Sequence, residues 1–138
     1  MNFISTRIVT TDVPGLTAFY ERVTGTDAVW SADVFAEIVT PSGTLAIADI
    51  KTMALFAGAA VAAENRSLFL EFIVDDVDAE YTRLGDVAGD LVQEPTTMPW
   101  GNRSLVFRDP DGNLVNLFAP VTEDAIARFR GVTRSAVA

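Results

Sequence analysis

Neither cysteine nor histidine occurs among the 138 residues of the chain. The absence of cysteine excludes disulfide bonds, thiolate nucleophiles and thiolate metal sites. The absence of histidine removes the side chain that most often serves as a general base, and also a common ligand of transition metals. Catalysis or metal binding would therefore depend on carboxylates, amides and hydroxyls.

Basic residues are also scarce, since 10 Lys and Arg stand against 19 Asp and Glu, for a formal net charge of −9. Nucleic acids and anionic membranes require clustered Lys and Arg, so neither is expected as a partner. An acidic surface raises the local concentration of a cationic ligand, although it also simply keeps a protein in solution. The N-terminus lacks a basic region followed by an apolar run, and the longest apolar stretch, residues 53–63, is too short to span a bilayer. These features predict a cytoplasmic protein.

The hydrophobic periodicity of the chain predicts one domain that contains the element order β-α-β-β-β twice. The first module, residues 1–50, is expected to hold a strand at 3–11, a helix at 12–25 and strands at 27–31, 34–40 and 44–50. The second module, residues 67–120, is expected to hold a strand at 67–74, a helix at 75–86 and strands at 90–95, 103–109 and 113–120. A linker at 51–66, interpreted as a short helix, a flap or a dimer contact, joins the modules, and a C-terminal helix occupies 121–131.

Matching landmarks support the repeat. Asp12-Val13 and Asp76-Val77 each lie where a strand gives way to a helix, and the turns Pro41-Ser42-Gly43 and Pro110-Asp111-Gly112 each join two strands. Two tandem βαβββ modules predict an α+β fold in which a curved mixed sheet surrounds a cleft, with the helices on the outer faces.

Strand alternation places Arg7 on one face of its strand together with Ser5, and the repeat places Glu71 at the position equivalent to Arg7. Two opposite charges inside one cleft are expected to pair. The pair would either orient the two sheets or hold a ligand, and the sequence leaves both roles open.

The repeat, the stretch TTDVPGLTAFYERVTG at 10–25 and the stretch FRDPDGNLVNLF at 107–118 resemble the vicinal oxygen chelate superfamily. This superfamily includes glyoxalase I, extradiol dioxygenases and bleomycin-resistance proteins. The resemblance implies a homodimer, and in metal-dependent members it implies one metal ligand on each of four inner strand positions. Those positions are here Ser5, Ile47 (Ala46 or Ala48 if the register differs), Phe69 and Asn116. Because divalent transition metals need imidazole, thiolate or carboxylate donors, no metal is expected, as in the metal-free bleomycin-resistance branch.

Little in the sequence indicates catalysis. There is no nucleophile elbow and no glycine-rich phosphate loop. Glu37, Asp49 and Glu71 are candidate bases, but no pattern singles one of them out, so no catalytic residue and no cofactor are assigned.

Aromatic and polar residues are instead expected to line the cleft. Trp100 is the most informative, because the stretch MPWGN places it at a hairpin end, where a core residue is not expected. The predicted ligand-binding residues are Arg7, Trp30, Phe35, Ile47, Phe56, Phe69, Glu71, Trp100, Asn116 and Phe118.

Three functions remain open. The leading hypothesis is a metal-independent binding protein that sequesters an aromatic or cationic small molecule, such as an antibiotic or a metabolite, in a dimeric cleft. The second is a metal-independent lyase or isomerase that uses a carboxylate base and an anion-stabilising Arg7. The third is an interaction module with a vestigial cleft.

Overall fold

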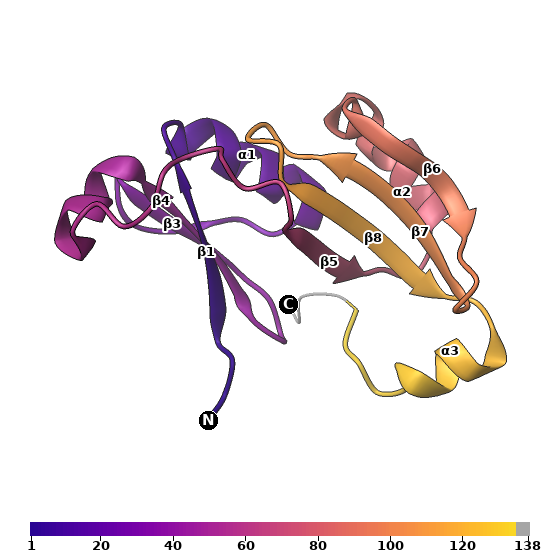
Figure 1. The fold of residues 1–138 in the computed structure, drawn as a ribbon. Coiled ribbons are helices and arrows are strands. Elements are labelled where there is room, and N and C mark those ends of the chain that lie inside the picture. The colour runs from indigo at the N-terminus through magenta and orange to yellow at the C-terminus, as the bar shows by residue number, and fades with distance from the viewer. Residues whose placement is uncertain (135–138) are drawn as a thin grey trace. The chain divides into compact units, whose positions relative to one another are not determined.

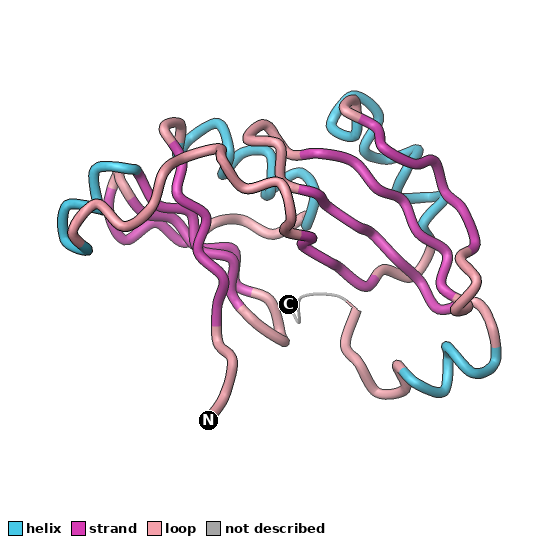
Figure 2. The backbone as a smooth tube through the Cα atoms, in the orientation of Figure 1, coloured by secondary structure: helices cyan, strands magenta, loops and turns pink. Residues whose placement is uncertain are grey.

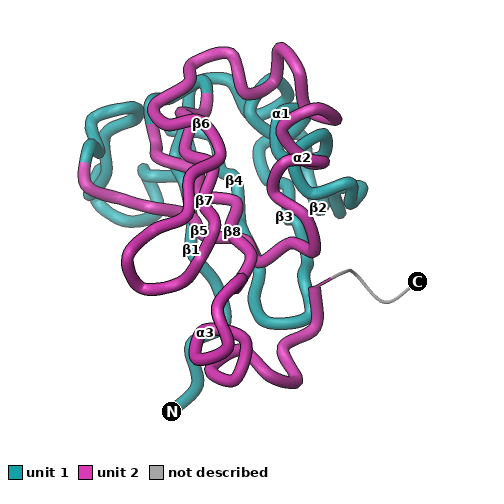
Figure 3. Tube along the Cα trace, turned by 90° about the vertical axis from the view of Figure 1, so that its right-hand side faces the viewer, with its two compact units in different colours: residues 1–66, 110–112, 136–138 teal, residues 67–109, 113–135 magenta. Residues whose placement is uncertain are grey.

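The computed structural model describes residues 1–134. In this part of the chain two compact units are present, one formed by residues 1–66 and 110–112 and the other by residues 67–109 and 113–134 (Figure 3). Each unit contains one four-stranded mixed sheet, in the element order expected from the sequence (Figure 1). The predicted α+β class with two βαβββ modules is thereby confirmed.

The sheet of the first unit has the strand order β1-β4-β3-β2. The central strand β4 runs parallel to β1 and antiparallel to β3, which makes the sheet mixed. Its strands are β1 (Ser5–Thr10), β2 (Val29–Ala32), β3 (Phe35–Val39) and β4 (Thr44–Asp49).

Helix α1 (Val13–Thr24) covers one face of this sheet (Figure 2). It begins at Asp12, whose carboxylate accepts a hydrogen bond from the amide of Gly15, and it ends at Gly25, which adopts the left-handed conformation with φ 67°. Leu16 and Tyr20 are buried between the helix and the sheet. The sheet residues of this core are Ile8, Ala36, Ile38, Leu45 and Ile47.

The linker begins with a 3₁₀ helix, η1 (Ile50–Phe56), as one of the interpretations of this segment predicted. The carboxylate of Asp49 accepts a hydrogen bond from the amide of Lys51 at the start of the helix. Ala57 follows Phe56 in the left-handed region, with φ 55°, and ends the helix. This short helix fixes the backbone that carries Phe56.

The second unit repeats the arrangement with the strand order β5-β8-β7-β6, and β8 runs parallel to β5. Helix α2 begins at Asp76, whose side chain accepts a hydrogen bond from the amide of Ala79. The elements are β5 (Phe69–Ile73), α2 (Val77–Leu84), η2 (Gly85–Ala88), β6 (Leu91–Thr97), β7 (Asn102–Arg108), β8 (Leu114–Pro120) and α3 (Glu123–Arg128). No helix among residues 1–134 is long and apolar enough to cross a membrane.

Two polar contacts fix local structure in this unit. Asp109 stabilises the turn between β7 and β8, because its carboxylate accepts hydrogen bonds from the amide and from Nδ2 of Asn113, at 2.8 and 2.9 Å. Arg103 of β7 donates from Nε and Nη2 to the two carboxylate oxygens of Asp78 in α2, at 2.6 and 2.7 Å. This hydrogen bonding lowers the pKa of Asp78 below its ordinary value of 3.8.

Candidate functional site

The first sheet presents a second face, opposite α1, that carries several of the predicted ligand-binding residues. Strand residues alternate between the two faces, so the pairing Arg7↔Ala46↔Glu37 defines a row on the side away from the helix. We call this the Arg7 face. It comprises Ser5, Arg7, Val9, Ala46, Ala48, Phe35 and Glu37.

Ile47 does not belong to the Arg7 face. It pairs with Ile8 and Ala36, its side chain is fully buried, and it lies on the side that α1 covers. The expectation that Ile47 occupies the inner strand position is therefore wrong, because a shift of one residue along a strand exchanges the two faces. Ala46 and Ala48 occupy that side of β4 instead, and neither supplies a polar atom.

On the Arg7 face, the guanidinium of Arg7 contacts two aromatic rings, those of Phe35 and Phe56. We call these three side chains the aromatic bracket. The guanidinium carbon of Arg7 lies 5.3 Å from the ring centroid of Phe35 and 5.7 Å from that of Phe56. Both distances fall within the range of cation–π interactions. Arg7 is exposed, and within its own unit, residues 1–66 and 110–112, it makes no hydrogen bond or salt bridge. All three residues were selected from the sequence.

The second sheet has an equivalent face opposite α2, which we call the Asn116 face. It includes Phe69, Glu71, Ile73, Ser104, Val106, Arg108, Leu114, Asn116 and Phe118. Glu71 and Asn116 are register partners in the parallel pair of β5 and β8, and Nδ2 of Asn116 donates to Oε2 of Glu71 at 2.7 Å. The predicted pairing of Arg7 with Glu71 joins residues of different units and stays a prediction.

Asn116 is the most distinctive polar residue of the Asn116 face. Its side chain is only 9% exposed, and its Oδ1 atom has no hydrogen-bond partner among the described residues. A buried acceptor without a donor costs about 1–3 kcal/mol. Two hydrogen-bond acceptors thus lie on the neighbouring strands β5 and β8. They are the exposed carboxylate of Glu71 and the buried Oδ1 of Asn116.

Aromatic rings flank this polar pair. Phe69, two residues before Glu71 on the same side of β5, is 49% exposed. Phe118, two residues after Asn116, packs against Phe129 with a centroid separation of 5.2 Å. Phe129 was not selected from the sequence, because it lies inside the C-terminal helix predicted at 121–131, where a single apolar residue is not a specific signal.

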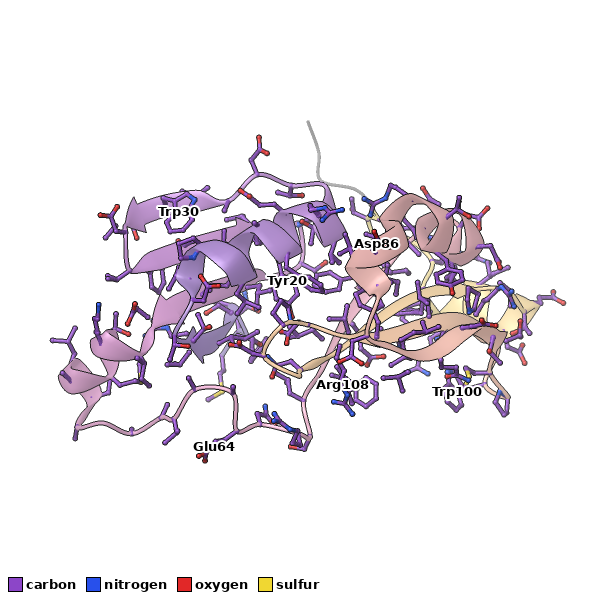
Figure 4. All side chains as sticks on the ribbon, turned by 90° about the horizontal axis from the view of Figure 1, so that it is seen from above. Tyr20, Trp30, Glu64, Asp86, Trp100 and Arg108 are labelled. Carbon is purple, nitrogen blue, oxygen red and sulfur yellow. The ribbon has the colours of Figure 1, made fainter. Side chains whose placement is uncertain are left out.

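The two tryptophans lie apart from these groups within their own units. Trp30 belongs to the edge strand β2 and pairs with Ala36, which places it on the α1 side of the sheet and not on the Arg7 face (Figure 4). Trp100 lies in the turn between β6 and β7 and is 61% exposed (Figure 4). The exposed hairpin end expected for Trp100 is present.

A family model described as the Glyoxalase/Bleomycin resistance protein/Dioxygenase superfamily matches residues 2–117. The chain belongs to this superfamily. The search of curated proteins found no significant match.

Solved structures of the superfamily share the fold. A glyoxalase/bleomycin resistance protein/dioxygenase family enzyme from Burkholderia phytofirmans PsJN is 19% identical, with a TM-score of 0.77 over 88% of this chain and 100% of that chain. A glyoxalase-related enzyme from Fulvimarina pelagi is 20% identical, with a TM-score of 0.74 over 86% and 88% of the two chains. A glyoxalase/bleomycin resistance protein/dioxygenase from Nocardioides is 22% identical, with a TM-score of 0.73 over 89% and 85%. At these identities the likeness shows the fold alone.

The residues present do not fit the metal that metal-dependent members of the superfamily hold. The four inner strand positions carry Ser5, an alanine of β4, Phe69 and Asn116, and the amide of Asn116 already donates to Glu71. Two neutral oxygen donors are a poor ligand set for a divalent transition metal. Among residues 1–134, no three His, Cys, Asp or Glu side chains are grouped so that they could hold a metal ion.

Proposed function

We propose that this superfamily member is a metal-independent cytoplasmic binding protein that sequesters a small aromatic or cationic compound, such as an antibiotic or a metabolite, without changing it. The proposed site is the Asn116 face. The observation that carries the proposal is the buried, unpartnered Oδ1 of Asn116 beside the carboxylate of Glu71.

This pair of acceptors favours a guest that brings N–H donors and a positive charge. Nδ2 of Asn116 fixes one carboxylate oxygen of Glu71 at 2.7 Å, which leaves the other oxygen, Oε1, for a guest. A protonated amine or amidinium would supply a charge-assisted hydrogen bond to Glu71 and a donor to Oδ1 of Asn116. Because Oδ1 is itself covered, the guest reaches it only after the side chains above it shift.

The surroundings also suit an aromatic cation. The half-exposed ring of Phe69 provides a stacking surface on the same side of β5 as Glu71. A cation over such a ring contributes about 0.5–1 kcal/mol at an exposed site and about 2 kcal/mol when it is desolvated. The net charge of −9 raises the local concentration of cations around the whole molecule.

We further propose that the protein acts as a homodimer. Leu55 and Val61 of the linker are 83% and 66% exposed. A second copy of the chain would remove this apolar surface from water.

The test is a comparison of native and denatured mass spectra, followed by titration with planar probes. We expect a dimer without stoichiometric metal that binds N-methylacridinium more tightly than uncharged acridine, a neutral ring of similar shape. Stoichiometric metal would contradict the metal independence, and equal binding of the two probes would contradict recognition of a cation.

A second candidate function is a metal-independent lyase or isomerase with Glu71 as the base. The hydrogen bond from Asn116 favours it, because it orients the carboxylate and leaves Oε1 available for a proton. A guest recovered chemically altered from the protein would support this function, and a guest recovered intact would support sequestration.

A further inference from the structure

We propose that the Arg7 face carries a further binding site, which recognises a carboxylate attached to a flat ring. Arg7 is the anion-binding group, and Phe35 and Phe56 hold its guanidinium and stack on the ring of the guest. This site lies in the other unit from the proposed cation site and selects the opposite charge.

The bracket preorganises Arg7 for a bidentate contact. The two rings come from different segments, Phe35 from β3 and Phe56 from the end of η1, and both lie within 5.7 Å of the guanidinium carbon. A cation–π contact depends on the charge of the guanidinium and takes up no hydrogen-bond acceptor, so the N–H donors of Arg7 can still bind a guest. Paired N–H donors at one edge match the two oxygens of a carboxylate.

The donors of Arg7 are not taken within its own unit. The chain has nearly twice as many acidic as basic residues, and yet none of the acids in residues 1–66 and 110–112 forms a salt bridge or hydrogen bond with Arg7. Glu37 lies in the same row, but Ala46 of β4 separates it from Arg7, which puts two strand spacings, about 10 Å, between the two backbones. Glu37 repels an anion, so the carboxylate of a guest is expected on the side of Arg7 away from β3.

An exposed ring on the Arg7 face offers a stacking surface for a flat guest. Phe56 is 54% exposed, so much of its ring remains available for stacking. A flat ring with one carboxylate therefore suits the charge of Arg7 and the exposed ring of Phe56 better than a branched aliphatic acid does.

The test uses benzoate as the probe, with cyclohexanecarboxylate as the acid without a flat ring and benzamide as the flat ring without a charge. Binding is measured by calorimetry and by the NMR shift of the Arg7 Nε–H signal. We expect benzoate to bind more tightly than both analogues and to shift this signal. Arg7→Lys keeps the charge but loses the planar fork, and it should weaken benzoate binding roughly tenfold or more. Phe56→Leu should weaken it about two- to fivefold.

Arg128→Lys is the matched control, because Arg128 is also exposed over a ring, 5.3 Å from the centroid of Phe129, and the substitution makes the same exchange of a guanidinium for an ammonium group. It should leave benzoate binding unchanged. Absence of benzoate binding, unchanged binding in Arg7→Lys, or equal losses in Arg7→Lys and Arg128→Lys would overturn the proposal. Melting temperatures of all variants check that each folds. Because the probe is an anion and the site lies in the first unit, failure here leaves the proposed cation site untouched.

Discussion

Glu71 and Asn116 lie side by side on the parallel strands β5 and β8, and the amide of Asn116 donates to the carboxylate of Glu71 at 2.7 Å. In the superfamily resemblance the position of Asn116 belongs to a metal ligand, and here its amide instead orients a neighbouring carboxylate. The contact leaves Oδ1 of Asn116 buried and unpartnered within the described chain, so the hydrogen-bonding capacity of the pair is only partly satisfied.

Two substitutions of Asn116 separate the contribution of its donor, Nδ2, from that of its unpartnered acceptor, Oδ1. Asn116→Asp replaces the donor by a carboxylate that faces Glu71, so we expect the free energy of unfolding to fall by about 1–3 kcal/mol. Asn116→Leu removes the donor and the unpartnered acceptor together, and it should cost less than Asn116→Asp. Urea unfolding at neutral pH measures both variants. A leucine variant less stable than the aspartate variant would show that Oδ1 is not a source of strain.

Removal of the charge at Glu71 tests its proposed role as the cation-binding group. Glu71→Gln keeps the size of the side chain and can still pair with Asn116, but it loses the charge-assisted hydrogen bond to a guest. The affinity for N-methylacridinium should fall roughly tenfold or more. Glu94→Gln, at an exposed position of β6 in the same unit, is the matched control and should leave the affinity unchanged. Equal effects of the two substitutions would indicate that only the net charge of the protein matters.

The contact between Asp78 and Arg103 predicts a dependence of stability on pH. Hydrogen bonding to Arg103 lowers the pKa of Asp78 in the folded protein below 3.8, so the folded state binds this proton more weakly than the unfolded state does. The stabilisation is therefore fully present above the unfolded pKa and is lost as the pH falls through the folded pKa. In Asp78→Asn the melting temperature should decline less steeply with acidification below pH 3.8 than in the native protein. Asp27→Asn, an exposed site in the other unit, should keep the native slope.

Most of the fold follows from local signals in the sequence. The caps at Asp12 and Asp76 and the turn at Asp109 to Gly112 have the chemistry that ends or reverses an element. The predicted bounds of the strands lie within two residues of the observed ones. Strand alternation also assigned Arg7 and Glu71 to the faces that the structure shows.

The candidate site is less predictable because its geometry depends on contacts that no local pattern encodes. Leu45, Ala46, Ile47 and Ala48 are all buried, so β4 has no alternation of polar and apolar residues that could reveal its faces. The contact of Phe56 with Arg7 depends on the path of the linker after β4, and the contact of Phe129 with Phe118 depends on the path of the chain after β8.

We attribute the expected lack of metal binding to the absence of suitable side chains at the inner strand positions. Introducing such side chains tests this explanation. In the native protein we expect added Ni²⁺ to leave the melting temperature unchanged, because the inner strand positions offer no imidazole or carboxylate. Phe69→His combined with Asn116→Asp places two new donors on the Asn116 face beside Glu71. This variant should be less stable than the native protein without metal, and Ni²⁺ should raise its melting temperature with increasing metal concentration, since a ligand that binds only the folded state stabilises it by mass action. Phe69→His alone is the control for nonspecific binding to a surface histidine. A rise in the native melting temperature with Ni²⁺ would show that the present residues already form a metal site and would contradict the proposed metal independence.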